Sequence, residues 1–181
     1  MDLPPTTPYH NLILTGHIGV GRVTIGRLIA KQMGIAFIDL DTELQLREGM
    51  TGDEIRALFG EARVRALEDE LCRELSLRRG AVLSVGGPTL LEEKNRTRLM
   101  NSGPMLILTC ALNEILRRLY ATQGARFHDP KIRSAALYQI RRERQIEQLA
   151  AVPTLDTTVL SVEQVAEHAI RFWKENDIVT T

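Results

Sequence analysis

Short apolar runs alternate with amphipathic stretches along this chain. The runs have the length of buried strands, and the segments between them carry apolar residues at helical spacing, as Ile25, Leu28 and Ile29 do. Strands that alternate with helices predict a parallel sheet covered on both faces, which is a three-layer α/β fold. We expect five strands, at residues 11–15, 35–40, 81–85, 105–109 and 154–159.

Helices are expected between these strands. Two capping boxes, Thr51 with Glu54 and Ser161 with Gln164, mark first turns, because each hydroxyl can accept from the backbone N–H three residues on. Over residues 121–131 the pattern lapses, and we expect a mobile, basic loop there. The predicted helices are 23–33, 41–48, 51 to a stop at Gly60, 61–79, 92–101, 112–120, about 132–149, and 161 to about 173.

The length predicts a single domain. The chain has 181 residues, within the roughly 100–200 of one compact domain. We therefore expect one domain over residues 1–181, with short tails at 1–10 and beyond Trp173 and no second functional domain. No run reaches the roughly 20 apolar residues of a membrane-spanning helix, and residues 1–10 lack the features of a signal peptide.

Charge and cysteine content narrow the choice of partners. The 23 Lys and Arg residues balance 23 Asp and Glu residues, so no broad field attracts nucleic acid or an anionic membrane. Aromatic residues, at 4%, are too few for stacking on single strands. Cys72 and Cys110 have no metal-ligand spacing to a histidine. We expect a cytoplasmic monomer that binds any anion locally and has neither nucleic acid nor membrane as a partner.

A glycine-rich segment joins the first strand to the first helix. Gly16, Gly19 and Gly21 have the spacing of the phosphate-binding P-loop, G-x-x-x-x-G-K-[ST], but Arg22 stands at the lysine and Val23 at the hydroxyl residue. The backbone N–H groups of such a turn, with the positive end of the following helix, bind phosphate. The alternative is that the glycines serve only a tight turn. Their offsets and context favour phosphate binding.

Further segments, in the same order along the chain, resemble those of the shikimate kinase family. They are residues 38–41, Gly49 and Met50, residues 64–68, Gly86 and Gly87, and the basic segment 121–131. The resemblance covers nearly the whole chain. It implies a fold like that of the nucleoside monophosphate kinases, with ATP on the P-loop. It also implies phosphoryl transfer to the 3-hydroxyl of shikimate in aromatic amino acid biosynthesis, with residues 49–80 as substrate-binding helices and 121–131 as a lid.

The resemblance assigns the nucleotide to the P-loop and the lid. It implies that Asp39 supports Mg²⁺ through water, while Val23 lacks the hydroxyl that ligates the ion directly, so water would have to replace it. Arg126 resembles the lid arginine that folds over the phosphates, although Phe127 stands where the family has proline; the alternative is a solvated charge. The implied nucleotide-binding residues are Gly16, Gly19, Val20, Gly21, Arg22, Val23, Thr24 and Arg126.

On the acceptor side, Asp41 matches the aspartate that accepts from the attacking hydroxyl; its alternative role is a helix N-cap. Arg65 matches the arginine that grips the substrate carboxylate; its alternative is a surface pair with Glu61. Pro88 replaces the third glycine of the family's turn and removes one N–H donor. The implied acceptor-binding residues are Asp41, Arg65, Gly86, Gly87 and Arg142, with Arg144 as the alternative to Arg142, and residues 141–144 could equally form one exposed charged face.

Two functions from different classes fit these residues. The first is an ATP-dependent kinase for shikimate or a similar small hydroxy acid, with Arg22, Asp41 and Arg126 in catalysis and unusual magnesium use. The second is a non-catalytic, kinase-like sensor or regulatory partner that binds a nucleotide or a small carboxylate, since losing one preorganised contact costs ~10²–10³ in turnover. A kinase for another polyol acid or a nucleotide fits less well, because Arg65 and Gly87 match the shikimate pattern. We adopt the first. His17 and His128 receive no role.

Overall fold

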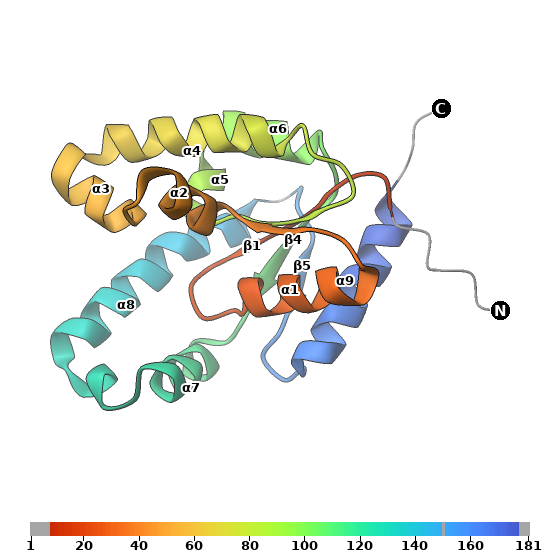
Figure 1. Cartoon of the computed structure of the whole chain (residues 1–181). Coiled ribbons are helices and arrows are strands. Elements are labelled where there is room, and N and C mark those ends of the chain that lie inside the picture. The colour runs from red at the N-terminus through yellow and green to blue at the C-terminus, as the bar shows by residue number, and fades with distance from the viewer. Residues whose placement is uncertain (1–7, 150, 178–181) are drawn as a thin grey trace.

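The chain forms a five-stranded parallel sheet. The computed structural model describes residues 8–149 and 151–177. The strands are β1 (Leu12–Gly16), β2 (Phe37–Asp39), β3 (Val82–Ser84), β4 (Met105–Thr109) and β5 (Thr154–Asp156). Their order is β2-β3-β1-β4-β5, every neighbouring pair is parallel, and β1 lies at the centre (Figure 1). The predicted parallel sheet is confirmed, with β2, β3 and β5 shorter than expected.

Helices cover both faces of this sheet. They are α1 (Arg22–Met33), α2 (Leu40–Glu48), α3 (Gly52–Phe59), α4 (Glu61–Leu75), α5 (Gly87–Leu91), α6 (Glu93–Met100), α7 (Leu112–Gln123), α8 (Pro130–Glu143) and α9 (Val162–Asn176), with short 3₁₀ helices η1 (Gly124–His128) and η2 (Arg144–Gln148). Figure 1 shows α1 and α9 on one side of the sheet and α4 and α6 on the other. The predicted three-layer arrangement is therefore confirmed. None of the helices described is long and apolar enough to cross a membrane.

Successive residues of each strand pack into opposite layers. In β1, Leu12 and Leu14 join the apolar cluster that contains residues of α1 and α9, whereas Ile13 joins the cluster that contains residues of α4. All three side chains are fully buried. This burial on both faces explains why the strands read as unbroken apolar runs.

Segments expected as tails contact each other. The Asp177 carboxylate accepts from the backbone N–H of Tyr9 at 2.8 Å and of His10 at 2.9 Å. Trp173, fully buried, donates its indole N–H to the His10 carbonyl at 3.1 Å. These hydrogen bonds connect Tyr9 and His10, at the start of the described chain, to the end of α9 and the residue that follows it. Residues 1–7 and 178–181 lie outside the described part.

Residues 121–131 are largely helical, whereas the sequence predicted a loop. The end of α7, η1 and the beginning of α8 occupy most of this segment. The Phe127 side chain is only 4% exposed and belongs to the core cluster of α1 and α9. The Tyr120 hydroxyl lies 2.8 Å from Nε2 of His128. The loop prediction is wrong because a contact distant in sequence, the burial of Phe127, orders the segment.

Several helix boundaries also differ from the prediction. The helix expected over 132–149 ends as an α-helix at Glu143 and continues as η2, so Arg142 and Arg144 lie in different elements. The helix expected over 61–79 ends at Leu75. A short helix that was not predicted, α5, begins at Gly87, with Pro88 in its first turn. Proline suits that position because the N–H it lacks has no partner within the helix.

β1 ends in a glycine that packs against the backbone of β4. Gly16 has φ 144°, and a Cβ there would lie 2.3 Å from the carbonyl oxygen of Leu108 and 3.1 Å from Cγ2 of Val20. A side chain at this position would push the β1–α1 turn away from the sheet. Gly16 therefore fixes where the chain leaves the sheet to form the glycine-rich loop.

This contact predicts a stability difference between two glycine substitutions. Gly16→Ala should lower the free energy of unfolding by about 2–3 kcal/mol, through overpacking and a strained φ. Gly52→Ala should change it by less than about 0.5 kcal/mol or raise it, because Gly52 is the first residue of α3 with nothing within 4 Å of its Cβ position. Urea unfolding of both variants measures this; equal losses would contradict the role given to Gly16.

Candidate active site

The glycine-rich loop and the start of α1 form an anion-binding cradle. Gly19 and Gly21 have φ values of 84° and 91°, and Gly21 is the N-cap of α1. Within the described structure, this cap makes no side-chain hydrogen bond and the first turn of α1 holds no acidic residue. The first N–H groups of α1 and its positive end are thus left for an anionic ligand.

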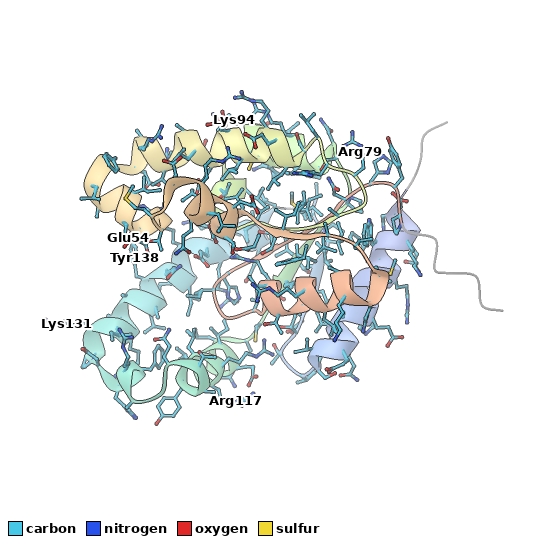
Figure 2. The ribbon with its side chains drawn as sticks, in the orientation of Figure 1. Glu54, Arg79, Lys94, Arg117, Lys131 and Tyr138 are labelled. Atoms are coloured by element: carbon cyan, nitrogen blue, oxygen red, sulfur yellow. The ribbon has the colours of Figure 1, made fainter. Side chains whose placement is uncertain are left out.

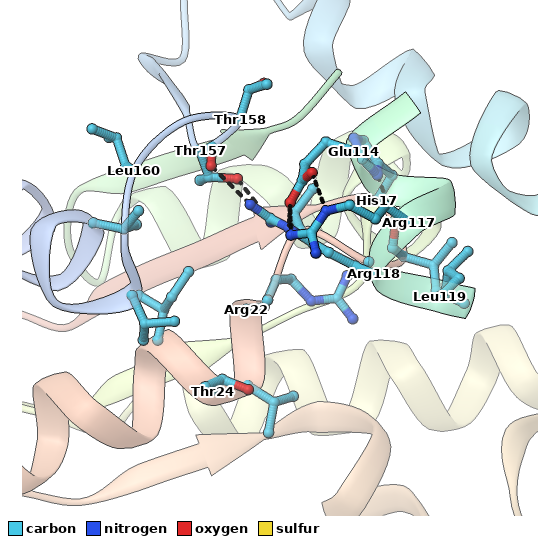
Figure 3. Close-up of a pocket in the computed structure, with 18 of the residues that line it drawn as sticks. His17, Arg22, Thr24, Glu114, Arg117, Arg118, Leu119, Thr157, Thr158 and Leu160 are labelled. Atoms are coloured by element: carbon cyan, nitrogen blue, oxygen red, sulfur yellow. Dashed lines mark hydrogen bonds and ion pairs between the residues drawn. The ribbon is translucent and has the colours of Figure 1, made fainter. Parts of the chain in front are cut away.

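Arg22 folds back over this loop. Its Nη1 donates to the carbonyl oxygen of Gly16 at 2.7 Å, and its Nη2 lies 3.7 Å from Oδ2 of Asp41. The side chain is only 15% exposed. The guanidinium is therefore held at the mouth of the cradle, where a P-loop lysine is expected. Val23, the next residue, has no side-chain oxygen, and the exposed Thr24 follows it in the first turn of α1 (Figure 3).

A cavity of about 780 Å³ opens beside the loop. The loop, α7 and the segment between β5 and α9 form its walls (Figure 3). Arg118 is fixed there by Glu114, at 2.9 Å, and by the Thr157 carbonyl, at 2.9 Å. Hydrogen bonds from Arg117 and Arg118 hold the pKa of Glu114 at about 2, so this cluster stays charged. Of the sequence-predicted residues, Gly19, Val20, Gly21, Arg22, Val23 and Thr24 line this cavity.

A second cavity, of about 620 Å³, lies on the other side of Arg22. Its walls come from the glycine-rich loop, α2, α3, α4, the turn at Gly86 and α8. Figure 2 locates one lining residue, Tyr138, on α8. Ile18 and Arg22 line both cavities. The two chambers therefore meet at the glycine-rich loop, as a donor site and an acceptor site for group transfer would.

Two aspartates occupy the end of β2 and the start of α2. Asp39 is the N-cap of α2, and its Oδ2 accepts from the N–H of Thr42 at 3.1 Å and from its hydroxyl at 2.9 Å. Asp41 lies in the first turn of α2 and lines the second cavity. The alternative of Asp41 as the N-cap is therefore wrong, because Asp39 has that role.

Asp39 also offers an unused oxygen. Its Oδ1 is buried without a hydrogen-bond partner, as is Oγ of Ser84, the residue opposite it on β3. Within the described residues, no three His, Cys, Asp or Glu side chains gather as a metal-binding group. Mg²⁺ with a nucleotide needs only one or two carboxylates, because phosphates and water complete its shell. Asp39 lines neither cavity, so its free oxygen fits such an ion through water, with a further water in place of the ligand that Val23 cannot supply.

Two carboxyl groups in the second cavity have altered acidity. Burial raises the pKa of Glu68 to about 7, and the nearby Asp41 charge adds to this shift while Thr89 opposes it. Burial within the cavity raises the pKa of Asp41, while the Arg22 guanidinium lowers it. The Asp41 side chain is 65% exposed and lines the cavity. Glu68 can therefore exchange a proton near neutral pH, and the raised pKa of Asp41 makes its carboxylate a stronger base than that of an ordinary aspartate.

Of the arginines that the resemblance assigns to ligands outside the P-loop, only one lines either cavity. Arg142 lines the second cavity and lies 3.5 Å from Glu61. Arg144 pairs with Glu147 and faces a different groove, so of these two only Arg142 reaches the cavity. Arg65 is 57% exposed, pairs with Glu61 at 3.6 Å and lines neither cavity. The exposed Arg126 lines neither one either.

Of the glycine pair, Gly86 lines the second cavity. Gly87 lies behind it, where a Cβ would come within 3.0 Å of the Glu143 carbonyl oxygen. Residues of the cavity that the sequence did not assign include Arg56, Glu68 and Glu143. Glu68 lies in the 64–68 segment that resembles the family and could have been found there. Nothing in the sequence distinguishes Glu143 from its charged neighbours.

The pKa of Glu68 predicts a pH dependence of stability. Because folding raises this pKa from 4.5 to about 7, the folded chain binds the proton more tightly, and stability falls as pH rises between these values. Glu68→Gln should raise the free energy of unfolding by about 2 kcal/mol at about pH 8, with a smaller gain at about pH 5. Glu70→Gln, on the exposed side of α4, is the control. Denaturant unfolding across pH tests this, and a gain independent of pH would refute it.

Comparison with known proteins agrees with this geometry. The family model described as shikimate kinase matches residues 18–174. A shikimate kinase from Thermodesulfovibrio yellowstonii is 30% identical over 161 residues, which cover 89% of this chain and 93% of that relative. One from Geobacter sulfurreducens is 33% identical over 166 residues, covering 92% of each.

Solved structures show the same fold. A shikimate kinase from Acinetobacter baumannii, in complex with shikimate, has a TM-score of 0.77 at 24% identity and covers 93% of this chain and 95% of its own. A gluconokinase from Sinorhizobium meliloti is more distant, with a TM-score of 0.60 at 17% identity, covering 93% and 95%. Because the family model spans most of the chain and full-length relatives reach 30% identity and more, this chain belongs to the shikimate kinase family.

Proposed function

We propose that this chain transfers the γ-phosphoryl group of ATP to a hydroxyl of shikimate or a similar small hydroxy acid. The observation that carries this proposal is the meeting of two cavities at Ile18 and Arg22. One is bounded by a phosphate-binding loop and the other by a carboxylate, Asp41, 3.7 Å from the Arg22 guanidinium. Relatives named as enzymes favour this function over a non-catalytic sensor. The proposal places the chain in the cytoplasm as a monomer, in aromatic amino acid biosynthesis.

The larger cavity is proposed to take the nucleotide. Its loop and the N-terminus of α1 supply N–H donors for the phosphates. The charged Arg118, fixed by Glu114 and Thr157, presents a planar group to the base at the far wall. These donors are fixed before the ligand arrives, which is how an enzyme lowers the cost of stabilising developing charge.

Arg22 is proposed to stabilise the charge of the phosphoryl group during transfer. It keeps the charge of a P-loop lysine on a planar group that is already hydrogen-bonded to Gly16. Because Arg22 lines both cavities, its guanidinium can contact the phosphoryl group while that group moves from ATP to the acceptor hydroxyl. The cost is a fixed orientation, because one guanidinium nitrogen is engaged by the loop itself.

Asp41 is proposed to orient the attacking hydroxyl and accept its proton. It lines the acceptor cavity beside Arg22, and its raised pKa makes it a stronger base than an ordinary aspartate. Arg142 and the turn at Gly86 are the proposed contacts for the rest of the acceptor. Arg65 and Arg126 would contact ligands only if residues 49–80 and the proposed lid, 121–131, closed over them.

Asp39 would hold Mg²⁺ through water, from its free Oδ1. When bound, the ion neutralises phosphate charge. The chain itself keeps Asp39 in place by the two hydrogen bonds from Thr42 to Oδ2, which leave Oδ1 without a partner. Without a hydroxyl at Val23, the affinity for the ion depends on Asp39 and the nucleotide alone.

Restoring the usual P-loop residues should therefore speed the reaction. Arg22→Lys combined with Val23→Ser should raise shikimate-dependent ADP release with Mg–ATP by roughly 10²-fold, because it restores a magnesium ligand and a mobile ammonium. Arg27→Lys, on the same helix outside both cavities, is the matched control. An unchanged rate in the double variant would show that Arg22 and Val23 do not limit phosphoryl transfer. Absence of shikimate-dependent activity in both the native chain and the double variant would refute shikimate as the acceptor.

Asp41→Asn should separate binding from chemistry. It keeps the shape of the side chain but removes the base, so kcat should fall by about 10²–10⁴ while the Kd for ATP changes less than about threefold. Glu43→Gln, in the same helix turn but outside the cavity, should leave kcat unchanged. Steady-state kinetics and calorimetric titration measure both values. An unchanged kcat in Asp41→Asn would remove Asp41 from the mechanism.

A further inference from the structure

Glu143 is a buried carboxylate at the wall between the two cavities. It is the last residue of α8, its surface is only 7% exposed, and it lines the acceptor cavity. Its Oε2 accepts from the backbone N–H of Ile18 at 2.5 Å, and its Oε1 accepts from Nε2 of Gln139 at 2.8 Å. These bonds hold the carboxylate against the glycine-rich loop.

No ion pair in the described part of the chain holds this group. Of the arginine, lysine and histidine side chains within residues 8–149 and 151–177, none forms an ion pair with Glu143. The cavity's other cations are engaged elsewhere, since Arg56 and Arg142 both reach Glu61 and Arg22 reaches Asp41. The C-terminal position in α8 adds the negative end of a helix dipole. A buried glutamate without an ion pair is uncommon, and its place on the cavity wall points to a role in the site.

Charged side chains of both signs line the acceptor cavity. Asp41, Asp53, Glu68 and Glu143 line it, against Arg22, Arg56 and Arg142. The charge on Glu143 raises the pKa of Asp41, so the two groups interact across the cavity. An acceptor carboxylate next to Glu143 would meet repulsion, whereas a hydroxyl could donate to the Glu143 oxygens.

We propose that Glu143 is a specificity-determining residue that lowers the preference of the acceptor site for an acid and admits neutral polyhydroxy acceptors. The inference rests on the proposed function, since it concerns the acceptor cavity of that reaction. Glu143 is proposed to affect how strongly the site prefers a charged over a neutral acceptor, and not how the nucleotide binds. The acceptor class is thereby widened from small hydroxy acids to cyclic polyols of similar size without a carboxylate.

The test uses two acceptors that differ in one charge. Shikimate and its methyl ester carry the same hydroxyls, so the ratio of their kcat/KM values isolates the effect of the carboxylate. Glu143→Gln keeps the size of the side chain and an oxygen for the Ile18 N–H. It should raise the acid-to-ester ratio by roughly tenfold, the order expected for a like-charge contact in a partly buried site. The KM for ATP should change less than about twofold.

Glu147→Gln is the matched control. This variant removes the same charge four residues further along the chain. Glu147 faces another groove and lines neither cavity, so the acid-to-ester ratio of kcat/KM should not change. Where turnover is too slow, the same ratio is taken from dissociation constants measured by calorimetry. Glu143→Ala, which also lacks the charge, replaces Glu143→Gln should that variant not fold.

The outcomes are distinct. A ratio that rises in Glu143→Gln and not in Glu147→Gln supports the proposal. Equal ratios in the native chain and Glu143→Gln, with both acceptors used, would overturn the role of Glu143 and leave the proposed function standing. Failure of both acceptors to bind or react with either protein, while ATP binds, would overturn the proposed acceptor and this inference together.

Discussion

The site depends on the close contact between Gly16 and the backbone of β4. Because a Cβ at Gly16 would lie 2.3 Å from the Leu108 carbonyl oxygen, the chain leaves the sheet at one place and in one direction. That exit sets the loop, the glycine N-cap of α1 and the position of Arg22. In the sheet, β1 lies between β3 and β4, so the loop that follows β1 starts at the centre of the sheet edge. The nucleotide and acceptor cavities meet at this loop.

Charge is arranged around this loop in opposing pairs. Arg22 contributes a cation that contacts both the loop carbonyl and Asp41, while Glu143 contributes an anion bound to the next part of the same loop. A site with fixed charges of both signs can discriminate between ligands by charge at low reorganisation cost. The same rigidity limits catalysis, since a held guanidinium follows a moving phosphoryl group less easily than a lysine does.

Local signals made the sheet, the loop and the capped helices predictable from sequence. Apolar runs identify strands buried on both faces, and both capping boxes occur as predicted. What could not be predicted depends on distant contacts. Burial of Phe127 turns an expected loop into helix, and the change from α8 to η2 decides that Arg142, and not Arg144, reaches the cavity. Glu143 is functional only by its place beside Ile18, which no sequence pattern encodes.

In the proposed reaction, the phosphoryl group passes from ATP to the acceptor at Ile18 and Arg22, the two residues that line both cavities. Phosphorus NMR of the native chain with Mg–ATP and shikimate tests it most directly, because it identifies the product. The account predicts a new phosphomonoester resonance that grows in step with the conversion of ATP to ADP. Formation of inorganic phosphate alone, or unchanged ATP in a sample where the nucleotide is bound, would contradict it.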